Sequence, residues 1–346
     1  MADTILHDSA MRLFGDLSTP AALAAAEKGR WPDALGNAVE EAGYGDVLAG
    51  GLAGMADAAT ILRAAGHHAA PIPLPETMLA RWLCAACGLE PPAGPLTLAP
   101  VEPGDKIMVV GDTLAGRAEF IPWGHDAAAI VLIAEGRLHV APRAQAGYEL
   151  DANLAGEPRD RLVAVAEGAA SAPLADGLDE AAVLRGGALA RAAQMAGAME
   201  AVLALSTRYA NDRIQFGRPI AKFQAIQQQL AVLAEETAAA LVAVEIAARA
   251  VTEARPSVEF AVAAAKIRTG EAAGKVAEIA HQAHGAIGFT EEHHLHRLTR
   301  RLWSWRDEFG SEAHWSLHLG RAVAAAGGDA LWPTITGIEI ASVRSQ

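Results

Sequence analysis

The sequence has few cysteines, few aromatic residues and no surplus of basic residues. Its 346 residues include two cysteines, 5% aromatic residues, and 28 Lys and Arg against 41 Asp and Glu. The net charge of −13 disfavours a general nucleic-acid binder, because phosphate contacts need a surplus of Lys and Arg. An anionic ligand is still compatible with this composition, since one basic pocket can lie on an acidic surface.

Long apolar runs and an N-terminal targeting pattern are also missing. The first residues lack a basic stretch followed by a long apolar one. No apolar run reaches the roughly 18 residues of a membrane span without a charge, Gly or Pro. We therefore expect a soluble, cytoplasmic protein that binds neither membranes nor nucleic acid. Hydrophobic residues make up 52% of the chain, which predicts a large core and little disorder.

The scarcity of cysteine limits the metal and redox chemistry that the chain could perform. Cys84 and Cys87 form a CxxC pair within an alanine-rich stretch. Such a pair can be a redox or metal motif, but zinc would need two further ligands and no second pair exists. We favour a buried structural role and predict no metal site, with a redox or metal role as the alternative. Histidines of the C-terminal half also lack a metal-ligand spacing: His281, His284, His293, His294 and His296.

What is abundant is alanine, which has the highest helix propensity and predicts a mostly α fold with a small β domain. Three domains are expected, at residues 1–95, 96–175 and 176–346. Helical patterns cover 31–42, 55–65, 75–87, 176–210, 224–255 and 258–285, and another begins at 294. Between 96 and about 165, short β runs alternate with Gly, Pro and Asp, which is typical of a small antiparallel barrel or sandwich. The long C-terminal helices with short links predict a four-helix bundle.

Two segments of the C-terminal half do not suit a helix interior. Residues 209–224 read YANDRIQFGRPIAKFQ, and residues 281–290 read HQAHGAIGFT. A helix interior loses about 1 kcal/mol of stability for Gly and about 3 kcal/mol for Pro, so both segments mark helix ends. Helix ends that gather Arg, Gln, His and free backbone N–H groups can hold a phosphate-bearing ligand.

These two segments and the order of the elements resemble the acyl-CoA dehydrogenase flavoproteins. The patterns that carry the resemblance are R-x-Q-F-G-x-P-I-x-x-F-Q at 213–224 and Q-x-H-G-x-x-G-F-T at 282–290. The resemblance is strong over about 180–325, moderate over 105–140 and weak at the N-terminus. It implies a helical N-terminal domain, a middle β-barrel and a C-terminal four-helix bundle. It also implies FAD bound between the domains and subunits of an oligomer.

The resemblance assigns the adenosine and pyrophosphate half of FAD to particular residues, often across a subunit interface. These are Arg213, Gln215, Phe216, Gln224, Gln282, His284 and Gly285. The chemistry agrees, because Arg can contact phosphate through two N–H groups and Gly lets backbone approach a ligand closely. A salt bridge is the alternative for Arg213, and capping of a buried helix end is the alternative for Gln282 and His284.

The reaction that the resemblance implies is α,β-dehydrogenation of an acyl-CoA thioester, in which a carboxylate removes the α proton and flavin accepts the β hydride. Most members place that carboxylate on a Glu before Gly-Thr. Matching Gly310 and Ser311 to this pair puts Phe309 at the position of the base. Other members use the first bundle helix, where the matching position falls near Gly187. Glu308 lies one residue before the position matched to the base, and a shifted loop would bring its carboxylate to that position.

A second departure from the family lies in the β domain. The family segment T-E-P-x-x-G-S-D, which lines the flavin ring, has only a shortened counterpart at residues 98–105. The chain thus resembles the shorter, base-lacking subunit of heterotetrameric bacterial dehydrogenases linked to sterol side-chain breakdown. We expect a related catalytic chain as partner and electron-transfer flavoprotein or a similar protein as acceptor. The alternatives are a self-sufficient homo-oligomer that uses Glu308, and a redox-inactive scaffold or acyl-CoA binder. The sequence does not specify the acyl group.

Overall fold

The structure is a computed structural model that describes residues 2–99, 106–110, 113–165 and 169–336. The chain begins with helices α1 (Ala2–Leu17), α2 (Pro20–Ala26), α3 (Asp33–Glu41), α4 (Met55–His67) and α5 (Leu74–Ala86). Strands follow as β1 (Leu96–Ala99), β2 (Lys106–Val110), β3 (Thr113–Pro122), β4 (Ala129–Ala134), β5 (Arg137–Pro142), β6 (Ala146–Glu149), β7 (Arg159–Val165) and β8 (Ala170–Pro173). The C-terminal half comprises α6 (Glu180–Asp212), β9 (Ile214–Gln215), β10 (Arg218–Pro219), α7 (Gln224–Thr252), α8 (Val258–His284), α9 (Leu295–Trp305), α10 (Glu312–Ala326) and α11 (Leu331–Thr336).

The strands of the middle segment form two four-stranded sheets, in the orders β1-β4-β5-β8 and β2-β3-β7-β6. Strand β1 pairs with β4 in parallel, and the other neighbours in these sheets are antiparallel. The expectation of a wholly antiparallel barrel was therefore wrong for one pair, and no closure of the two sheets is seen among the described strands. The parallel pair arises because the chain leaves β1, builds β2 and β3 in the other sheet, and returns to β4 in the same direction. Residues 100–105 of the shortened segment lie outside the described residues.

The predicted helical bundle is present. Helices α6, α7 and α8 pack on one another, and α9 packs on α6 and α8. Helix α4 of the N-terminal segment lies against α6 at two glycines, Gly66 and Gly197. A Cβ atom on Gly197 would lie 1.8 Å from the carbonyl oxygen of Arg63, so only glycine permits this close approach. Helix α6 is long and apolar enough to span a membrane, but 78% of its most apolar stretch is buried, as in the core helix of a soluble protein.

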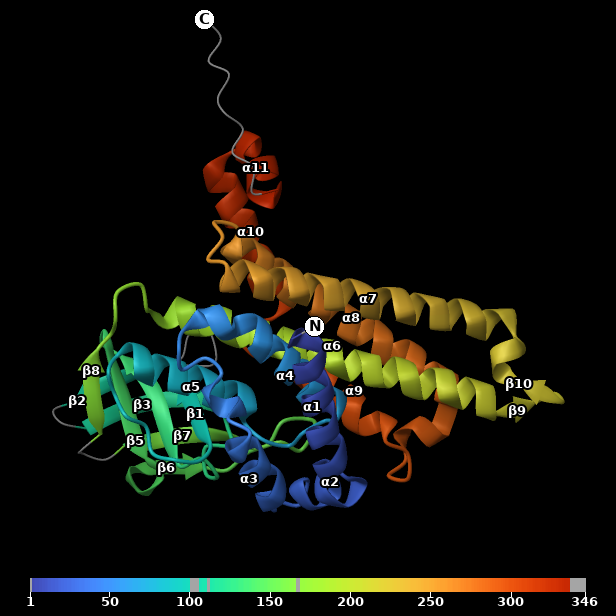
Figure 1. Cartoon of the computed structure of the whole chain (residues 1–346), viewed down its shortest axis with the longest axis horizontal. Coiled ribbons are helices and arrows are strands. Elements are labelled where there is room, and N and C mark those ends of the chain that lie inside the picture. The colour runs from blue at the N-terminus through green and yellow to red at the C-terminus, as the bar shows by residue number, and fades with distance from the viewer. Residues whose placement is uncertain (1, 100–105, 111–112, 166–168, 337–346) are drawn as a thin grey trace, which may run out of the picture.

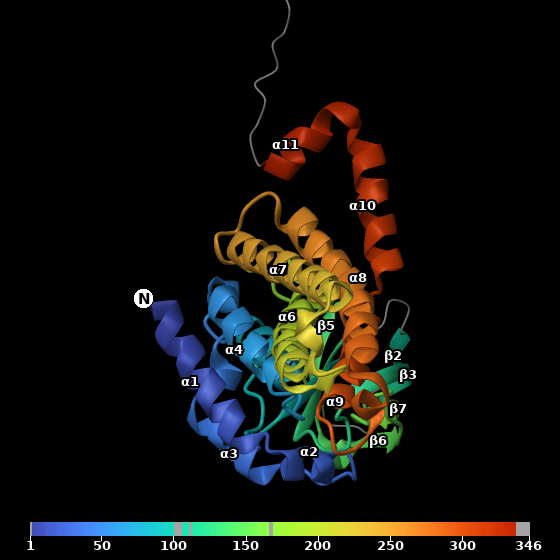
Figure 2. The same ribbon diagram turned by 90° about the vertical axis from the view of Figure 1, so that its right-hand side faces the viewer.

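The sheets and the β9–β10 hairpin lie at opposite ends of the molecule, with the bundle between them (Figure 1). Helices α10 and α11 project from the bundle as an arm (Figures 1 and 2). The end of the bundle that carries the hairpin also carries the turn after α8, so both sequence motifs lie far from the sheets (Figure 1).

Candidate functional site

An aromatic contact joins the two motif segments. Tyr209, in the last turn of α6, stacks on His284 at the end of α8, with ring centroids 4.5 Å apart and an interplanar angle of 23°. His293 packs edge-on against the same histidine, at 4.7 Å. The structure therefore brings the start of the hairpin and the turn after α8 to one place, which their separation in the sequence could not show.

The hairpin between α6 and α7 is exposed and carries the predicted phosphate contacts. Arg213 ends α6, and with the Gln215 amide turned so that its oxygen faces the guanidinium, that oxygen lies 2.8 Å from Nη2. Phe216 has φ of 50° and is 92% exposed, with its ring edge-on to Phe223. Helix α7 begins at Gln224 without a side-chain cap, so its first N–H groups are free. An exposed guanidinium and an uncapped helix N-terminus each suit an anion.

His284, in contrast, is directed into the protein. Its Nδ1 lies 2.7 Å from the carbonyl oxygen of Ala280, and its Nε2 has no hydrogen-bond partner among the described residues. Burial lowers the pKa of this imidazole, so it is neutral at pH 7. Its contacts pack the end of α8 against Tyr209, and it does not line the neighbouring cleft. A role of His284 in cofactor binding stays a prediction.

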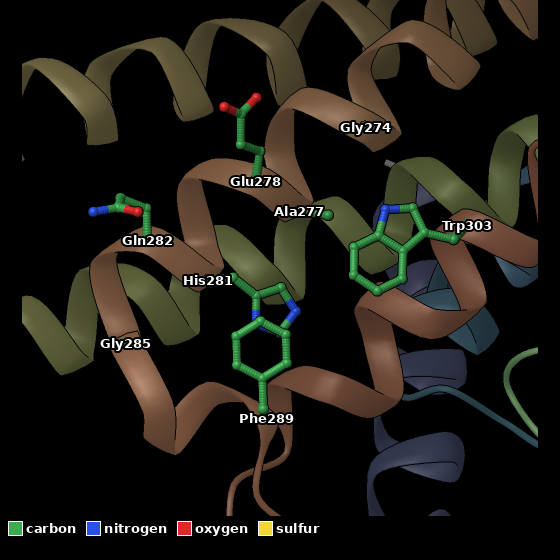
Figure 3. A pocket seen from close by; sticks show the side chains of 8 residues that line it. All are labelled: Gly274, Ala277, Glu278, His281, Gln282, Gly285, Phe289 and Trp303. Atoms are coloured by element: carbon green, nitrogen blue, oxygen red, sulfur yellow. The ribbon is translucent and has the colours of Figure 1, made fainter.

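A cleft of about 540 Å³ lies beside the turn after α8. Figure 3 shows it between the outer side of α8 and the indole of Trp303, which projects from α9. The residues that line it are Gly274, Ala277, Glu278, His281, Gln282, Gly285, Phe289 and Trp303. Sequence reasoning found Gln282 and Gly285. It missed the residues four, seven, eight and eleven positions before Gly285, although that spacing keeps them on one helix face.

Three aromatic rings form one wall of this cleft. The ring of His281 stacks on Phe289 at 4.0 Å and 20°, and on Trp303 at 5.7 Å and 14°. His281 Nε2 lies 2.8 Å from the hydroxyl of Thr299, which fixes the ring, and burial lowers its pKa. The wall is therefore flat and uncharged at neutral pH.

The two positions at which the family resemblance places a catalytic carboxylate contact each other in the protein core. Phe309 is fully buried, and a Cβ atom on Gly187 would lie 2.1 Å from its Cδ1. Phe309 has φ of 54°, and the indole N–H of Trp315 donates to its carbonyl oxygen at 3.0 Å. Neither position carries an acid, and the phenylalanine ring fills the space between them.

Glu308, the acid next to that position, is held by two arginines. Its Oε1 accepts from Arg159 Nε at 2.8 Å, and its Oε2 accepts from Arg191 Nε at 2.6 Å. Although burial opposes ionisation, these guanidinium groups lower the pKa of Glu308 to about 2. The network extends through Glu76, Glu157, Arg301 and Trp305. Its members come from α5, α6, β7, α9 and their flanking turns, so it ties the sheets to the helices.

Lys266 fixes the backbone of the same turn. It is fully buried in α8, and its Nζ donates to the carbonyl oxygens of Arg306 at 2.6 Å and Gly310 at 2.8 Å. Burial lowers its pKa to about 8. The turn that carries Glu308 and Phe309 is thus held from both its side chains and its backbone.

The cysteines lie away from these sites. Cys84 is buried in α5 and Cys87 is partly buried, and both are free thiols. Burial raises the pKa of Cys84 to about 12, which makes its thiolate scarce at neutral pH. Among the residues that the structure describes, no group of three or more His, Cys, Asp and Glu could hold a metal ion.

Comparison with known proteins assigns the chain to a family. Residues 179–323 match the model of the acyl-CoA dehydrogenase C-terminal domain. Over 257 residues the chain is 33% identical to acyl-CoA dehydrogenase IpdE2 of Mycolicibacterium smegmatis, covering 73% of this chain and 74% of that protein. This chain belongs to the acyl-CoA dehydrogenase family. Membership in this family of oxidoreductases implies a flavin cofactor.

Other relatives of the acyl-CoA dehydrogenase family match over shorter spans or share the fold alone. The acryloyl-CoA reductase (NADH) of Anaerotignum propionicum is 38% identical over 117 residues, which cover 34% of this chain and 29% of that protein. The ChsE4-ChsE5 complex from Mycobacterium tuberculosis includes a chain with a TM-score of 0.79 and 22% identity, covering 94% of this chain and 97% of that one.

Proposed function

We propose that this chain is the base-lacking subunit of an FAD-dependent acyl-CoA dehydrogenase and works with a related chain that supplies the catalytic carboxylate. The observation that carries the proposal is the contact between Phe309 and Gly187. Both positions at which the family places its base lack an acid here, and the buried ring of Phe309 fills the space where a carboxylate would stand.

The missing acid matters because the dehydrogenation reaction needs a carboxylate base. Removal of the α proton of an acyl thioester needs a carboxylate within hydrogen-bond reach, with a pKa near the working pH. Bound FAD would accept the hydride from the β carbon. Glu308 does not suit the role of base, because both of its oxygens already accept from guanidinium groups and its pKa is about 2. This disfavours the alternative of a self-sufficient enzyme that uses Glu308.

The site residues fit the adenosine and pyrophosphate half of FAD. Arg213 and the uncapped N-terminus of α7 offer positive charge, and the cleft beside Gln282 offers a flat, uncharged wall. Because the sheets lie at the other end of the molecule (Figure 1), one FAD held by both regions would span two chains. The solved ChsE4-ChsE5 complex, which has this fold, is named as a pair of chains. A mixed oligomer with a related dehydrogenase chain is the arrangement proposed here.

The proposal also covers the substrate, the electron acceptor and the cellular location of the enzyme. The substrate is an acyl-CoA of fatty-acid or sterol type, and the electron acceptor is electron-transfer flavoprotein or a similar protein. The cytoplasm is the proposed location, with no nucleic-acid or membrane partner. The net charge of −13 and the burial of α6 support the last two points.

The visible spectrum of the purified chain tests the proposal, measured alone and after co-expression with related chains encoded nearby. A colourless chain that becomes yellow and active with a partner supports it. A chain that is yellow alone and bleaches on addition of acyl-CoA would instead establish the self-sufficient enzyme. A chain that stays colourless and inert with every partner would favour the redox-inactive scaffold or acyl-CoA binder.

A further inference from the structure

A groove of about 630 Å³ lies between α6 and α7, apart from the cleft beside α8. The two helices pack on each other and run in opposite directions from the β9–β10 hairpin (Figure 1). The groove residues of α6 recur every three or four positions, which keeps them on one face of that helix. The lining consists of Glu200, Leu203, Ala204, Thr207, Arg208 and Asn211 of α6, Ala234, Thr237, Ala238 and Leu241 of α7, and His67 at the end of α4.

The middle of the groove is apolar. Leu203 and Leu241 flank it, and the three alanines that line it leave room because their side chains end at Cβ. Thr237 is buried, and its hydroxyl donates to the carbonyl oxygen of Leu233 at 2.8 Å, so its polar group is already satisfied. The α6 wall is about 16 Å long from its first groove residue to its last. This shape suits a single alkyl chain of medium length.

The end of the groove near the hairpin carries a positive charge. Arg208 is exposed, and its guanidinium makes no hydrogen bond or ion pair with another residue that the structure describes. Thr207 and Asn211 lie at the same end, where the amide of Asn211 donates to the carbonyl oxygen of Thr207 at 2.8 Å. The hydroxyl and the amide add neutral donors beside the guanidinium. These groups together suit a small anionic head group.

The other end of the groove carries no net charge. Glu200 accepts two hydrogen bonds from Arg63, at 2.5 Å each, so its carboxylate is neutralised by a paired guanidinium. Burial lowers the pKa of His67, which keeps this imidazole neutral at pH 7. Among the residues that line the groove, Arg208 is therefore the one charge without a described counter-charge.

We propose that this groove binds a single-chain amphiphile with an anionic head, such as a medium-length alkanoate. The carboxylate contacts Arg208, which can donate through two parallel N–H groups, and the alkyl chain lies along the alanines of α6 and α7. A groove that is charged at one end and apolar along its length matches a ligand with the same distribution. The site shares no residue with the proposed cofactor contacts, so this inference does not depend on the proposed function.

Isothermal titration calorimetry of the full chain tests the proposal, with octanoate, octanol and octyltrimethylammonium below their micelle concentrations. We expect octanoate to bind most tightly and octanol about tenfold more weakly, the size expected for loss of a hydrogen bond between charged groups. Octyltrimethylammonium should bind most weakly, because it brings a like charge to Arg208. From hexanoate to decanoate, affinity should rise about two- to fourfold per methylene, since full burial of one methylene contributes a factor of about four.

Two variants, each with a matched control, locate the ligand. Arg208→Gln should weaken octanoate binding about tenfold and leave octanol binding unchanged, whereas Arg321→Gln, at another exposed arginine on α10, should change neither. Ala238→Phe places a ring in the groove and should abolish binding of both ligands. Ala239→Phe, at the next exposed position of α7 and outside the lining, should bind both ligands like the wild type.

The alkanoate site is rejected if no binding is detected, if octanoate and octanol bind equally, or if the two phenylalanine variants behave alike. Should Ala238→Phe fail to fold, Arg208→Gln and the three head groups still decide the question. The chain co-expressed with a related chain should bind octanoate as the chain alone does. Loss of binding in that complex would assign the groove to a subunit contact, and binding to anionic vesicles that depends on Ala238 would assign it to a lipid surface. Either result overturns the inference and leaves the flavin proposal standing, because neither flavin nor turnover is measured.

Discussion

Phe309 packs directly on the backbone of Gly187, so closely that a Cβ atom on the glycine would lie 2.1 Å from the ring. Phe309 is fully buried and its ring lies 5.6 Å from the guanidinium carbon of Arg191. The position at which the family resemblance places the catalytic acid is therefore part of the hydrophobic core. A glycine in the middle of α6 costs helix stability, and this contact gives a physical reason for it.

The first prediction concerns this contact. Gly187→Ala should lower the free energy of unfolding by about 1–3 kcal/mol, because the added methyl group overpacks a core that cannot yield. Gly320→Ala is the matched control, since Gly320 lies in α10 with open space around it. The control should be as stable as the wild type or up to about 1 kcal/mol more stable. Urea unfolding measures both. Equal stability of the two variants would mean that the ring moves aside freely.

The second prediction separates a structural Glu308 from a catalytic one. Glu308→Gln leaves Arg159 and Arg191 buried without their shared counter-charge, and should lower the free energy of unfolding by about 3–5 kcal/mol. Glu245→Gln removes the acid of an exposed pair with Arg249 and should change it by less than about 1 kcal/mol. A catalytic base would give the opposite pattern for Glu308→Gln, with turnover lost and the unfolding curve unchanged.

The third prediction concerns the loss of folding stability as the pH falls below 7. Burial lowers the pKa of His294 and of His68 from 6.5 to about 4, so the folded protein keeps both rings neutral. The unfolded chain binds protons at these sites below about pH 6.5, so the stability they give is present above that pH and lost as pH falls toward 4. Urea unfolding at pH 7, 6, 5 and 4 should show this decline. His294→Asn should make the slope shallower, and an unchanged slope would contradict the assignment.

The pKa of Glu308 predicts a second loss of folding stability at lower pH. Its pKa is about 2 in the folded protein against a usual 4.5, so its stabilisation is present above about pH 4.5 and lost as pH falls toward 2. The difference in stability between wild type and Glu308→Gln should therefore shrink across this window. A difference that stays constant from pH 5 to pH 3 would mean that the arginines do not hold the carboxylate.

Local patterns in the sequence predicted the helices well because helix formation depends on nearby residues. The pattern over 258–285 became α8 at Val258–His284, and the pattern from 294 became α9 at Leu295–Trp305. The pairing of the strands could not be predicted in the same way, since β1 pairs with a strand about 30 residues later, in parallel. The division at residues 95 and 175 into three domains stays a prediction.

The candidate site was predictable in part. Gln282 and Gly285 stand out because they end a helix, and both line the cleft. Trp303 could not be assigned, since its place in the cleft depends on how α9 folds back on α8. The ion pairs of Glu308 join residues 149 and 117 positions apart, and no local pattern reports such a contact. The sequence predicts that the base is missing from the positions matched to the family, and only the packing shows that Phe309 and Gly187 contact each other there.

The last prediction concerns flavin retention. Arg213 is exposed at the end of α6, and its guanidinium makes its one described polar contact with Gln215. Arg213→Ala should therefore leave the melting temperature within error of the wild type, while flavin bound per chain in the co-expressed complex falls at least tenfold, as expected for loss of a charge-assisted phosphate contact. Arg249→Ala, an exposed arginine of α7 far from the hairpin, should change neither quantity. Absorbance at 450 nm relative to protein and a thermal melt give the two readouts. Unchanged flavin content with an intact melt would remove Arg213 from the cofactor site, and the pyrophosphate would then have to be held by the N-terminus of α7 or by the partner chain.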